Sequence, residues 1–237
     1  LSNPANAWGS VIGNALDRGV GYTPYGEHCA QLCGLEVALP SGELVRTGMD
    51  AMRNGRAAPL FRYGFGPSWD QLFVQSNFGV VTRAGMWLMP EPEATLGLTF
   101  ALPETTDIIW ALELLRGLRL QRVIDSSVTM GNYLRTATMR SQRAEWHRGP
   151  GPIPPDVERR IMEAYGLGRW NFTINLFGHE TILEARARVI REAFAAHYRG
   201  EIHETRWRRG EPPPQSGAHI PTLIFLQVIN WWGGRGG

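Results

Sequence analysis

Two prolines separated by a single residue, Pro90 and Pro92, divide the chain into stretches with different patterns. Proline has no backbone N–H and a fixed φ, so this pair does not fit inside a helix or a central strand. Before the prolines, short alternating runs lie between glycine-rich turns, and after them helical patterns become frequent. We therefore predict two domains, residues 1–90 and residues 91–237.

Apolar residues recur at two spacings, and each spacing predicts one kind of element. The predicted strands are residues 34–39, 44–47, 79–89, 95–102, 122–127, 170–177 and 202–206. The predicted helices are residues 68–75, capped by Ser68, then 103–118, 156–165, capped by Asp156, and 179–197. The stripe expected to be buried along the last helix is Ile182, Ala185, Val189, Ala193 and Phe194. The second domain should be an antiparallel sheet flanked by helices, which places the fold in the α+β class.

The composition excludes several classes of protein. The 237 residues are 43% hydrophobic and 19% charged, as in globular domains and unlike disordered chains. No run of about 18 apolar residues is present, so no membrane-spanning helix is expected. The basic run at residues 206–209 is too short for a nucleic-acid site. Cys29 and Cys33 are too few for a disulfide scaffold or a closed zinc site, so we expect packed thiols and no metal.

Residues 9–28 are dense in glycine, and this glycine-rich block is the most informative stretch of the chain. Glycines allow backbone N–H groups to face a phosphate or a polarised ring. The spacing matches neither the phosphate loop of nucleotide hydrolases nor the glycine pattern of dinucleotide-binding folds. On spacing alone, a ligand-binding loop and a set of structural turns are equally favoured.

The glycine-rich block resembles the second flavin-contacting segment of the vanillyl-alcohol oxidase / p-cresol methylhydroxylase (PCMH) family of FAD enzymes, which includes eugenol oxidase. The likeness continues through Tyr63-Gly-Phe-Gly-Pro67, the segment 75–82, Met86-Trp-Leu-Met-Pro90 and the segment 167–171. It implies that residues 1–90 are the second half of a PCMH-type FAD-binding domain and residues 91–237 an incomplete substrate-binding cap. The family's pyrophosphate loop and its phenolate-binding Tyr–Arg pair are not among these residues, so we expect a piece lacking both ends that binds FAD weakly by itself.

The resemblance also implies a set of FAD-binding residues. These residues are Gly9, Ser10, Gly13, Asn14, Arg18, Gly19, Gly21, Gly26 and His28 in the block, and Gly79, Val80 and Val81 in a later strand. From the residue types alone, tight turns and a buried strand remain open as alternatives. For Asp17 and Arg18 the alternative is a capped helix end with an internal ion pair, and for His28 it is a structural ring bonded to backbone.

Two residues are candidates for catalysis. Tyr22 matches a family position that lines the aromatic substrate pocket, where its hydroxyl could share a proton with a phenolate; a half-buried core tyrosine is the alternative. Many relatives place an acid near the reactive flavin nitrogen, at a position that falls around Ala5 and Asn6 in this chain. No acid occurs there, so Asp17 is the nearest substitute.

The resemblance implies FAD-dependent oxidation of para-substituted phenols by hydride transfer from the benzylic carbon to flavin. Alternatives are a 2-hydroxy acid dehydrogenase of the same superfamily and a non-catalytic or truncated relative. The expected partners are a small phenol, O₂ or a cytochrome c as electron acceptor, and a second copy in a homo-oligomer, with neither nucleic acid nor membrane. The expected compartment is the cytoplasm, with the periplasm as the alternative.

Overall fold

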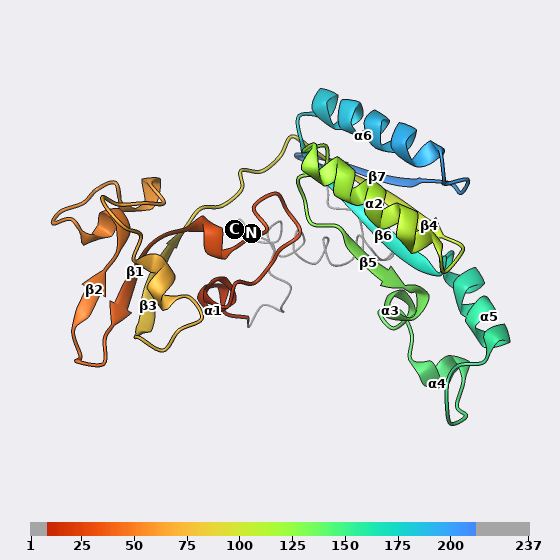
Figure 1. Ribbon diagram of the computed structural model, residues 1–237, viewed down its shortest axis with the longest axis horizontal. Helices are drawn as coiled ribbons and strands as arrows, with labels where there is room; N and C mark the ends of the chain where they lie inside the picture. The colour runs from red at the N-terminus through yellow and green to blue at the C-terminus, as the bar shows by residue number, and fades with distance from the viewer. Residues whose placement is uncertain (1–8, 212–237) are drawn as a thin grey trace. The chain divides into compact units, whose positions relative to one another are not determined.

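The computed structural model describes residues 9–211, which fall into two compact units that meet between Pro90 and Glu91 (Figure 1). The division falls at the proline pair. The stiff turn expected at residues 212–214 and the apolar stretch expected at 220–232 lie outside the described residues.

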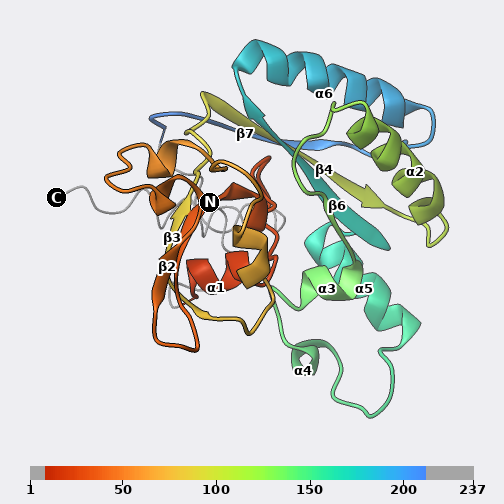
Figure 2. The same cartoon turned by 60° about the vertical axis from the view of Figure 1, so that its left-hand side comes forward.

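The first unit is built on a three-stranded antiparallel sheet in the order β2-β1-β3 (Figure 2). Its elements are α1 (Val11–Leu16), β1 (Leu32–Ala38), β2 (Leu44–Arg46) and β3 (Val80–Met86). All three predicted strands of this unit are present. The β1–β2 turn closes because Gly42 adopts a φ of +87° and its N–H donates to the Leu39 carbonyl over 2.9 Å. The core of this unit lies between α1 and the sheet and includes Ala15, Leu35 and Val37.

The helix predicted over residues 68–75 is wrong. Only a 3-10 turn, Asp70–Phe73, forms there, and Ser68 does not cap it. A single turn gains too few hydrogen bonds to be stable alone, and this one is held by a buried side chain instead. Asp70 is buried and its carboxylate accepts a hydrogen bond from the Thr47 hydroxyl, which ties the turn to the end of β2.

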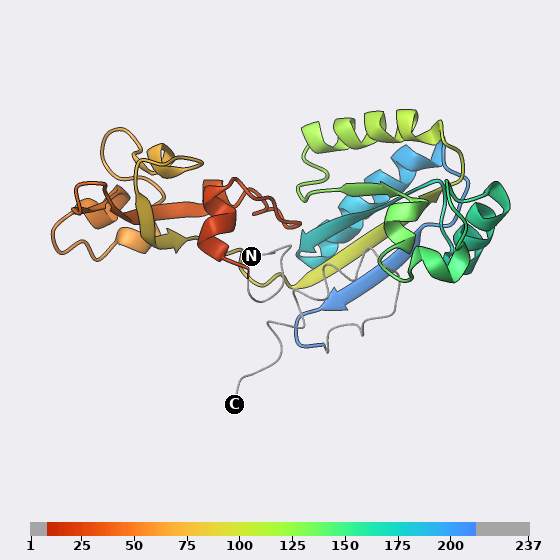
Figure 3. The same ribbon diagram turned by 90° about the horizontal axis from the view of Figure 1, so that it is seen from below.

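The second unit is a four-stranded antiparallel sheet in the order β5-β6-β4-β7. Its strands are β4 (Ala94–Leu102), β5 (Thr129–Asn132), β6 (Trp170–Gly178) and β7 (His203–Arg208). Its helices are α2 (Asp107–Leu120), α3 (Tyr133–Ala137), α4 (Arg143–Trp146), α5 (Pro155–Tyr165) and α6 (Glu180–Ala195). Helices α2 and α6 cover the same face of the sheet (Figure 3). This is the layer arrangement that the sequence predicts. None of the described helices is long and apolar enough to cross a membrane.

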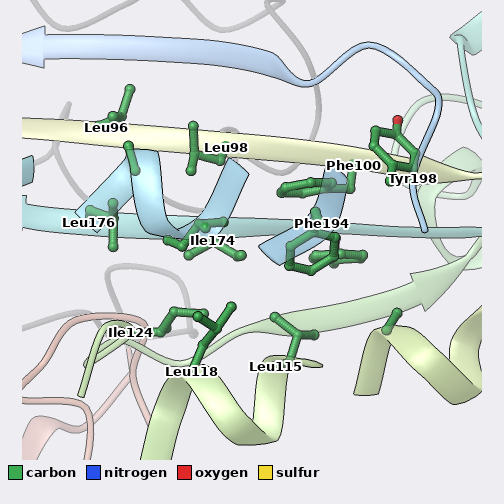
Figure 4. Packing of buried hydrophobic residues seen from close by; sticks show 14 of the residues in the cluster. Leu96, Leu98, Phe100, Leu115, Leu118, Ile124, Ile174, Leu176, Phe194 and Tyr198 are labelled. Carbon is green, nitrogen blue, oxygen red and sulfur yellow. The ribbon is translucent and has the colours of Figure 1, made fainter. Parts of the chain in front are cut away.

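Aromatic rings gather at one end of the second core, next to aliphatic side chains such as Leu98 and Ile174 (Figure 4). Phe100 on β4 stacks on Phe172 of β6 with ring centroids 4.9 Å apart, and Phe194 of α6 lies 4.4 Å from Phe100. Tyr198 closes the same cluster, with its ring centroid 5.4 Å from that of Phe100. Strands β4 and β6 pair in unbroken register from Ala94 and Gly178 to Leu102 and Trp170, so their inward side chains alternate in step.

The strand predicted over residues 122–127 is also wrong, because β5 begins only at Thr129. Arg122 turns the chain with a φ of +57°, which a strand does not allow. After Arg122, side-chain hydrogen bonds hold this segment in place of the backbone hydrogen bonds of a sheet. The Ser126 hydroxyl donates to the Asn175 carbonyl, and the Arg119 guanidinium donates to the Ser126 carbonyl.

Two helices differ from expectation in detail. On α6 the buried side chains are Leu183, Ala187, Ile190 and Phe194, whereas Ile182 of the predicted stripe is 53% exposed. Successive residues are rotated by about 100° around a helix, so the adjacent apolar residues Ile182 and Leu183 point to different faces. The apolar pattern alone therefore did not determine which face of α6 is buried. Helix α5 is preceded by Pro154 and not capped by Asp156, although it ends as predicted at Gly166, which adopts a φ of +60°.

A glycine inside α2 offers a simple test of helix propensity. Gly117 lies in the last turns of α2, and a Cβ placed there would meet no atom within 4 Å. Gly117→Ala is therefore expected to raise the free energy of unfolding by about 0.5–1 kcal/mol, because alanine loses less backbone entropy in a helix. Urea unfolding followed by far-ultraviolet circular dichroism would measure the change. A decrease in stability would contradict the prediction.

A third apolar cluster contains Tyr133 of α3 and Ile161 of α5, and a charged network borders it. The Tyr133 hydroxyl donates to the Glu158 carboxylate, and Arg169 donates to the other oxygen of that carboxylate over 2.8 Å. These two hydrogen bonds lower the pKa of Glu158 below its ordinary 4.5. Burial, and after it the hydrogen bond to Glu158, raises the pKa of Tyr133.

The Glu158 network predicts acid sensitivity. The unfolded chain takes up a proton on Glu158 more readily than the folded chain, so the stabilisation is complete above the ordinary value of 4.5 and is lost as the pH falls through the lowered pKa. Glu158→Gln is expected to flatten the decline in thermal midpoint below pH 4.5 and to lower that midpoint by a few degrees at pH 7. Glu113→Gln, which breaks an exposed pair with Arg116, is the control and should change little. Equal effects of the two variants would contradict the prediction.

Candidate functional site

The first half of the glycine-rich block folds into one short helix and a reversal. The Ser10 hydroxyl caps α1 by accepting the Gly13 N–H over 2.9 Å. The helix ends at Asp17, and Arg18, with a φ of +55°, turns the chain back. The structural alternative for Asp17 and Arg18 was a capped helix end with an internal ion pair. Asp17 does cap the end of α1. Neither Asp17 nor Arg18 forms an ion pair with another residue in the described range 9–211.

The second half of the block is a tight loop closed by an isolated bridge between Val20 and Glu27. Inside the loop, the Gly21 N–H donates to the Gly26 carbonyl over 2.6 Å. A Cβ on Gly26 would lie 2.6 Å from the Gly21 oxygen and 2.8 Å from the Thr23 oxygen, so the loop closes only around glycine. Tyr22 lies half-buried in this loop. The Thr23 hydroxyl is buried and has no hydrogen-bond partner within residues 9–211.

The block also brings together three predicted cofactor residues, Asn14, Gly19 and His28. The Nδ1–H of His28 donates to the Oδ1 of Asn14, and the Gly19 N–H donates to the Asn14 carbonyl over 2.7 Å. His28 is buried, and this burial lowers the pKa of its ring. The structural alternative for His28 was a ring that bonds to a backbone group. It is wrong about the bonded group, because the ring bonds to the side chain of Asn14, 14 positions earlier.

The predicted FAD-binding residues Val80 and Val81 begin β3, and Gly79 directly precedes them. A Cβ on Gly79 would lie 2.6 Å from the Val37 Cγ1, so glycine lets β3 approach β1 closely. Val81 faces the core that also contains Ala15 of α1, whereas Val80 is exposed. The block and this strand are thus joined through one apolar core.

A polar pocket of about 250 Å³ adjoins the block and was missed by sequence reasoning. Its lining is Arg18, Glu27, Cys29, Ala30, Leu32, Arg62, Tyr63, Ser68, Asp70 and Gln71. These residues come from three separate segments, and no spacing in the sequence connects them. A larger pocket of about 540 Å³, lined by Phe65, Trp69 and Phe78 among others, contains none of the predicted site residues.

The two cysteines are structural, as expected. Cys29 and Cys33 are both buried and unpaired, although Cys29 lies in a 3-10 turn and not in a strand. Burial and the nearby Asp70 carboxylate raise the pKa of Cys33, which makes its thiol unreactive. Among residues 9–211, no three metal-ligating side chains lie close enough to hold a metal ion.

Comparison with known proteins gives the site its context, although no family model matches the chain. The chain is 33% identical over 231 residues to the flavoprotein subunit of 4-cresol dehydrogenase (hydroxylating) from Pseudomonas putida. The matched residues make up 95% of this chain and 44% of that protein. The substrate-bound crystal structure of p-cresol methylhydroxylase matches 94% of this chain and 44% of its own, with 31% identity and a TM-score of 0.77. Over nearly its whole length, the chain is similar to flavoproteins of the p-cresol methylhydroxylase family.

A second family structure agrees. The isoeugenol complex of 4-ethylphenol oxidase from Gulosibacter chungangensis matches 96% of this chain and 43% of its own, with 31% identity and a TM-score of 0.83. The predicted α+β fold of the p-cresol methylhydroxylase type is therefore confirmed. The chain spans less than half the length of these relatives.

The residues of the glycine-rich block fit the flavin of the p-cresol methylhydroxylase family. One polar atom of the loop, the Thr23 Oγ1, is buried without a partner among residues 9–211. Buried polar atoms that are left without a partner cost free energy, and functional sites are where they concentrate. Gly19 and Gly26 leave no room for a Cβ, so the backbone of this block can pack closely next to the Thr23 side chain. Ala5 and Asn6, where relatives place an acid, lie outside the described residues.

Proposed function

We propose that this protein is part of an FAD-dependent oxidoreductase that oxidises para-substituted phenols of the vanillyl alcohol, eugenol or 4-alkylphenol type. The observation that carries the proposal is the relationship over 95% of the chain to a 4-cresol dehydrogenase flavoprotein subunit. The conformation of the glycine-rich block supports it, because this segment is organised around glycines that admit no side chain.

The block would hold FAD with its backbone and with a few side chains. Ser10, Gly13 and Asn14 present the first helical turn, and Arg18 is exposed at the reversal, where its guanidinium can donate to a phosphate or carbonyl oxygen. Bound FAD would supply the acceptor for a hydride from the benzylic carbon, which is chemistry that amino-acid side chains do not supply. Gly79, Val80 and Val81 are proposed to contact the adenine side.

Tyr22 is proposed to bind the substrate. A phenol becomes a better hydride donor at its para benzylic carbon when its oxygen carries negative charge, so a hydroxyl that donates to the phenolate favours the reaction. Tyr22 is half-buried in a loop whose backbone is closed by the bridge between Val20 and Glu27. Asp17, exposed at the end of α1, is the proposed proton acceptor in place of the acid found in relatives.

The test uses the complete polypeptide encoded by the reading frame that contains these residues. After purification with added FAD, its visible spectrum is recorded before and after acid precipitation. It is then mixed without O₂ with 4-ethylphenol, vanillyl alcohol or lactate, and O₂ or cytochrome c is added afterwards to identify the electron acceptor. Bleaching of the flavin by the phenols alone supports the proposal. Bleaching by lactate would favour a 2-hydroxy acid dehydrogenase, and the absence of bound flavin would mean a non-catalytic relative.

Tyr22→Phe tests the phenolate contact within this proposal. Removal of one hydrogen-bond donor to an oxyanion in an active site lowers turnover by about 100-fold. We expect a loss of that size when Tyr22→Phe oxidises 4-ethylphenol. FAD binding should be retained, since the ring and the loop remain. Tyr25→Phe, in the same loop, is the matched control and should turn over at nearly the original rate. Equal rates in the two variants would remove Tyr22 from the substrate site.

A further inference from the structure

The His28 ring is the most deeply buried titratable group in the glycine-rich block, with 1% of its surface exposed. Its Nδ1 bonds to the Oδ1 of Asn14. An amide oxygen only accepts hydrogen bonds, so the hydrogen lies on Nδ1 and the neutral ring leaves Nε2 as an acceptor. The ring is thus one tautomer, with its donor committed to a single side chain.

Asn14 is enclosed from a second direction by Gly19. A Cβ on Gly19 would collide with the amide group of Asn14, so only glycine leaves the amide its space. The backbone ties the same three residues together, because Gly19 donates to the Asn14 carbonyl over 2.7 Å and His28 donates to the Gly19 carbonyl over 3.3 Å. We call Asn14, Gly19 and His28 the Asn14 clasp.

The Asn14 clasp fixes which way the amide points. Without a partner, an asparagine amide samples two orientations that differ by a half-turn about its terminal bond. In the clasp the oxygen faces His28, and the Nδ2 donor group therefore faces the opposite side of the Cγ atom. A group held in one orientation before binding loses less entropy when a ligand arrives.

We propose that His28 is a positioning residue, which does not contact the flavin but holds the Asn14 amide so that its Nδ2 group donates to an acceptor oxygen of FAD. The inference rests on the FAD binding proposed above and not on the choice of phenol. It separates two residues that the sequence resemblance grouped together as cofactor contacts, and it gives each a different role.

The experiment measures FAD affinity in the complete polypeptide by quenching of flavin fluorescence. His28→Asn places an amide nitrogen where Nδ1 lies, whereas His28→Gln carries the same group one methylene further out. We expect His28→Gln to raise the Kd for FAD by about tenfold, the size of one hydrogen bond, and His28→Asn to stay within about twofold of the original. In an Asn14→Ala background, His28→Gln should produce no further loss.

A purely structural role for His28 would give other results. The proposal is overturned if His28→Gln weakens FAD binding equally with and without Asn14, if the Asn and Gln variants behave alike, or if only the thermal midpoint of the apoprotein falls. Should His28→Gln not fold, His28→Asn and Asn14→Ala decide, since the first should keep FAD affinity and the second lose it about tenfold. An original polypeptide that binds no FAD overturns the proposed function as well, whereas failure to oxidise phenols with FAD bound leaves this inference standing.

Discussion

Phe100→Ala is expected to lower the free energy of unfolding of the second unit by about 3–5 kcal/mol, the cost of deleting a buried phenylalanine. Phe100 is fully buried on β4, the strand paired on both sides within the sheet. Its ring contacts Phe172, Phe194 and Tyr198, so the deletion removes partners from β6, α6 and the turn after α6 at once. Helices that pack on the sheet through these rings cannot close the cavity without moving as a whole.

Urea unfolding followed by tryptophan fluorescence measures this loss. Ile109→Ala is the matched control, because it removes a similar apolar side chain that is 71% exposed on α2. It should change stability by less than about 0.5 kcal/mol. A loss below about 2 kcal/mol for Phe100→Ala would contradict the prediction that the ring cluster is a major part of this core.

Gly26→Ala is expected to have the largest effect on the proposed flavin site. The added Cβ would lie within 2.8 Å of two backbone oxygens, those of Gly21 and Thr23. Neither oxygen is the end of a flexible side chain, so the loop must open and the hydrogen bond from Gly21 to the Gly26 carbonyl is lost. Such overpacking costs about 1–3 kcal/mol, and the loop that carries Tyr22 changes shape with it.

We expect FAD affinity of the complete polypeptide to fall by at least about tenfold in Gly26→Ala, equivalent to about 1.4 kcal/mol, and phenol oxidation to fall below detection. Gly117→Ala in α2 is the control for the same chemical change, since it places a methyl group in open space. Retention of both FAD affinity and turnover in Gly26→Ala would show that the loop at residues 20–27 does not form the site.

Local patterns account for the parts of the fold that could be predicted. The strands with strict alternation, such as β4 and β6, appear within two residues of their predicted bounds. The end of α5 was predictable because Gly166 occupies a left-handed conformation that favours glycine. Predictions failed where nearby residues did not decide the outcome. Residues 122–127 look like a strand, yet side-chain bonds from Arg119 and Ser126 hold them in a turn.

The candidate site divides in the same way. The glycine-rich block was recognisable from its sequence, and so were the residues that resemble flavin contacts. The bond between His28 and Asn14 was not, because it joins positions 14 residues apart through a reversal that depends on Arg18 and Gly19. The polar pocket beside the block was equally hidden, since Cys29, Arg62 and Asp70 meet only after the strands pair.

By itself, the sequence determined the division at Pro90 and Pro92, the elements with clear periodicity and the glycine-rich block, because proline, glycine and alternating apolar residues act on the backbone within a few positions. Only the tertiary structure decided which face of α6 is buried, which partner His28 has and why Gly26 cannot carry a side chain. Those outcomes depend on atoms brought together from distant positions, where contact and exclusion of water, and not local propensity, select the conformation.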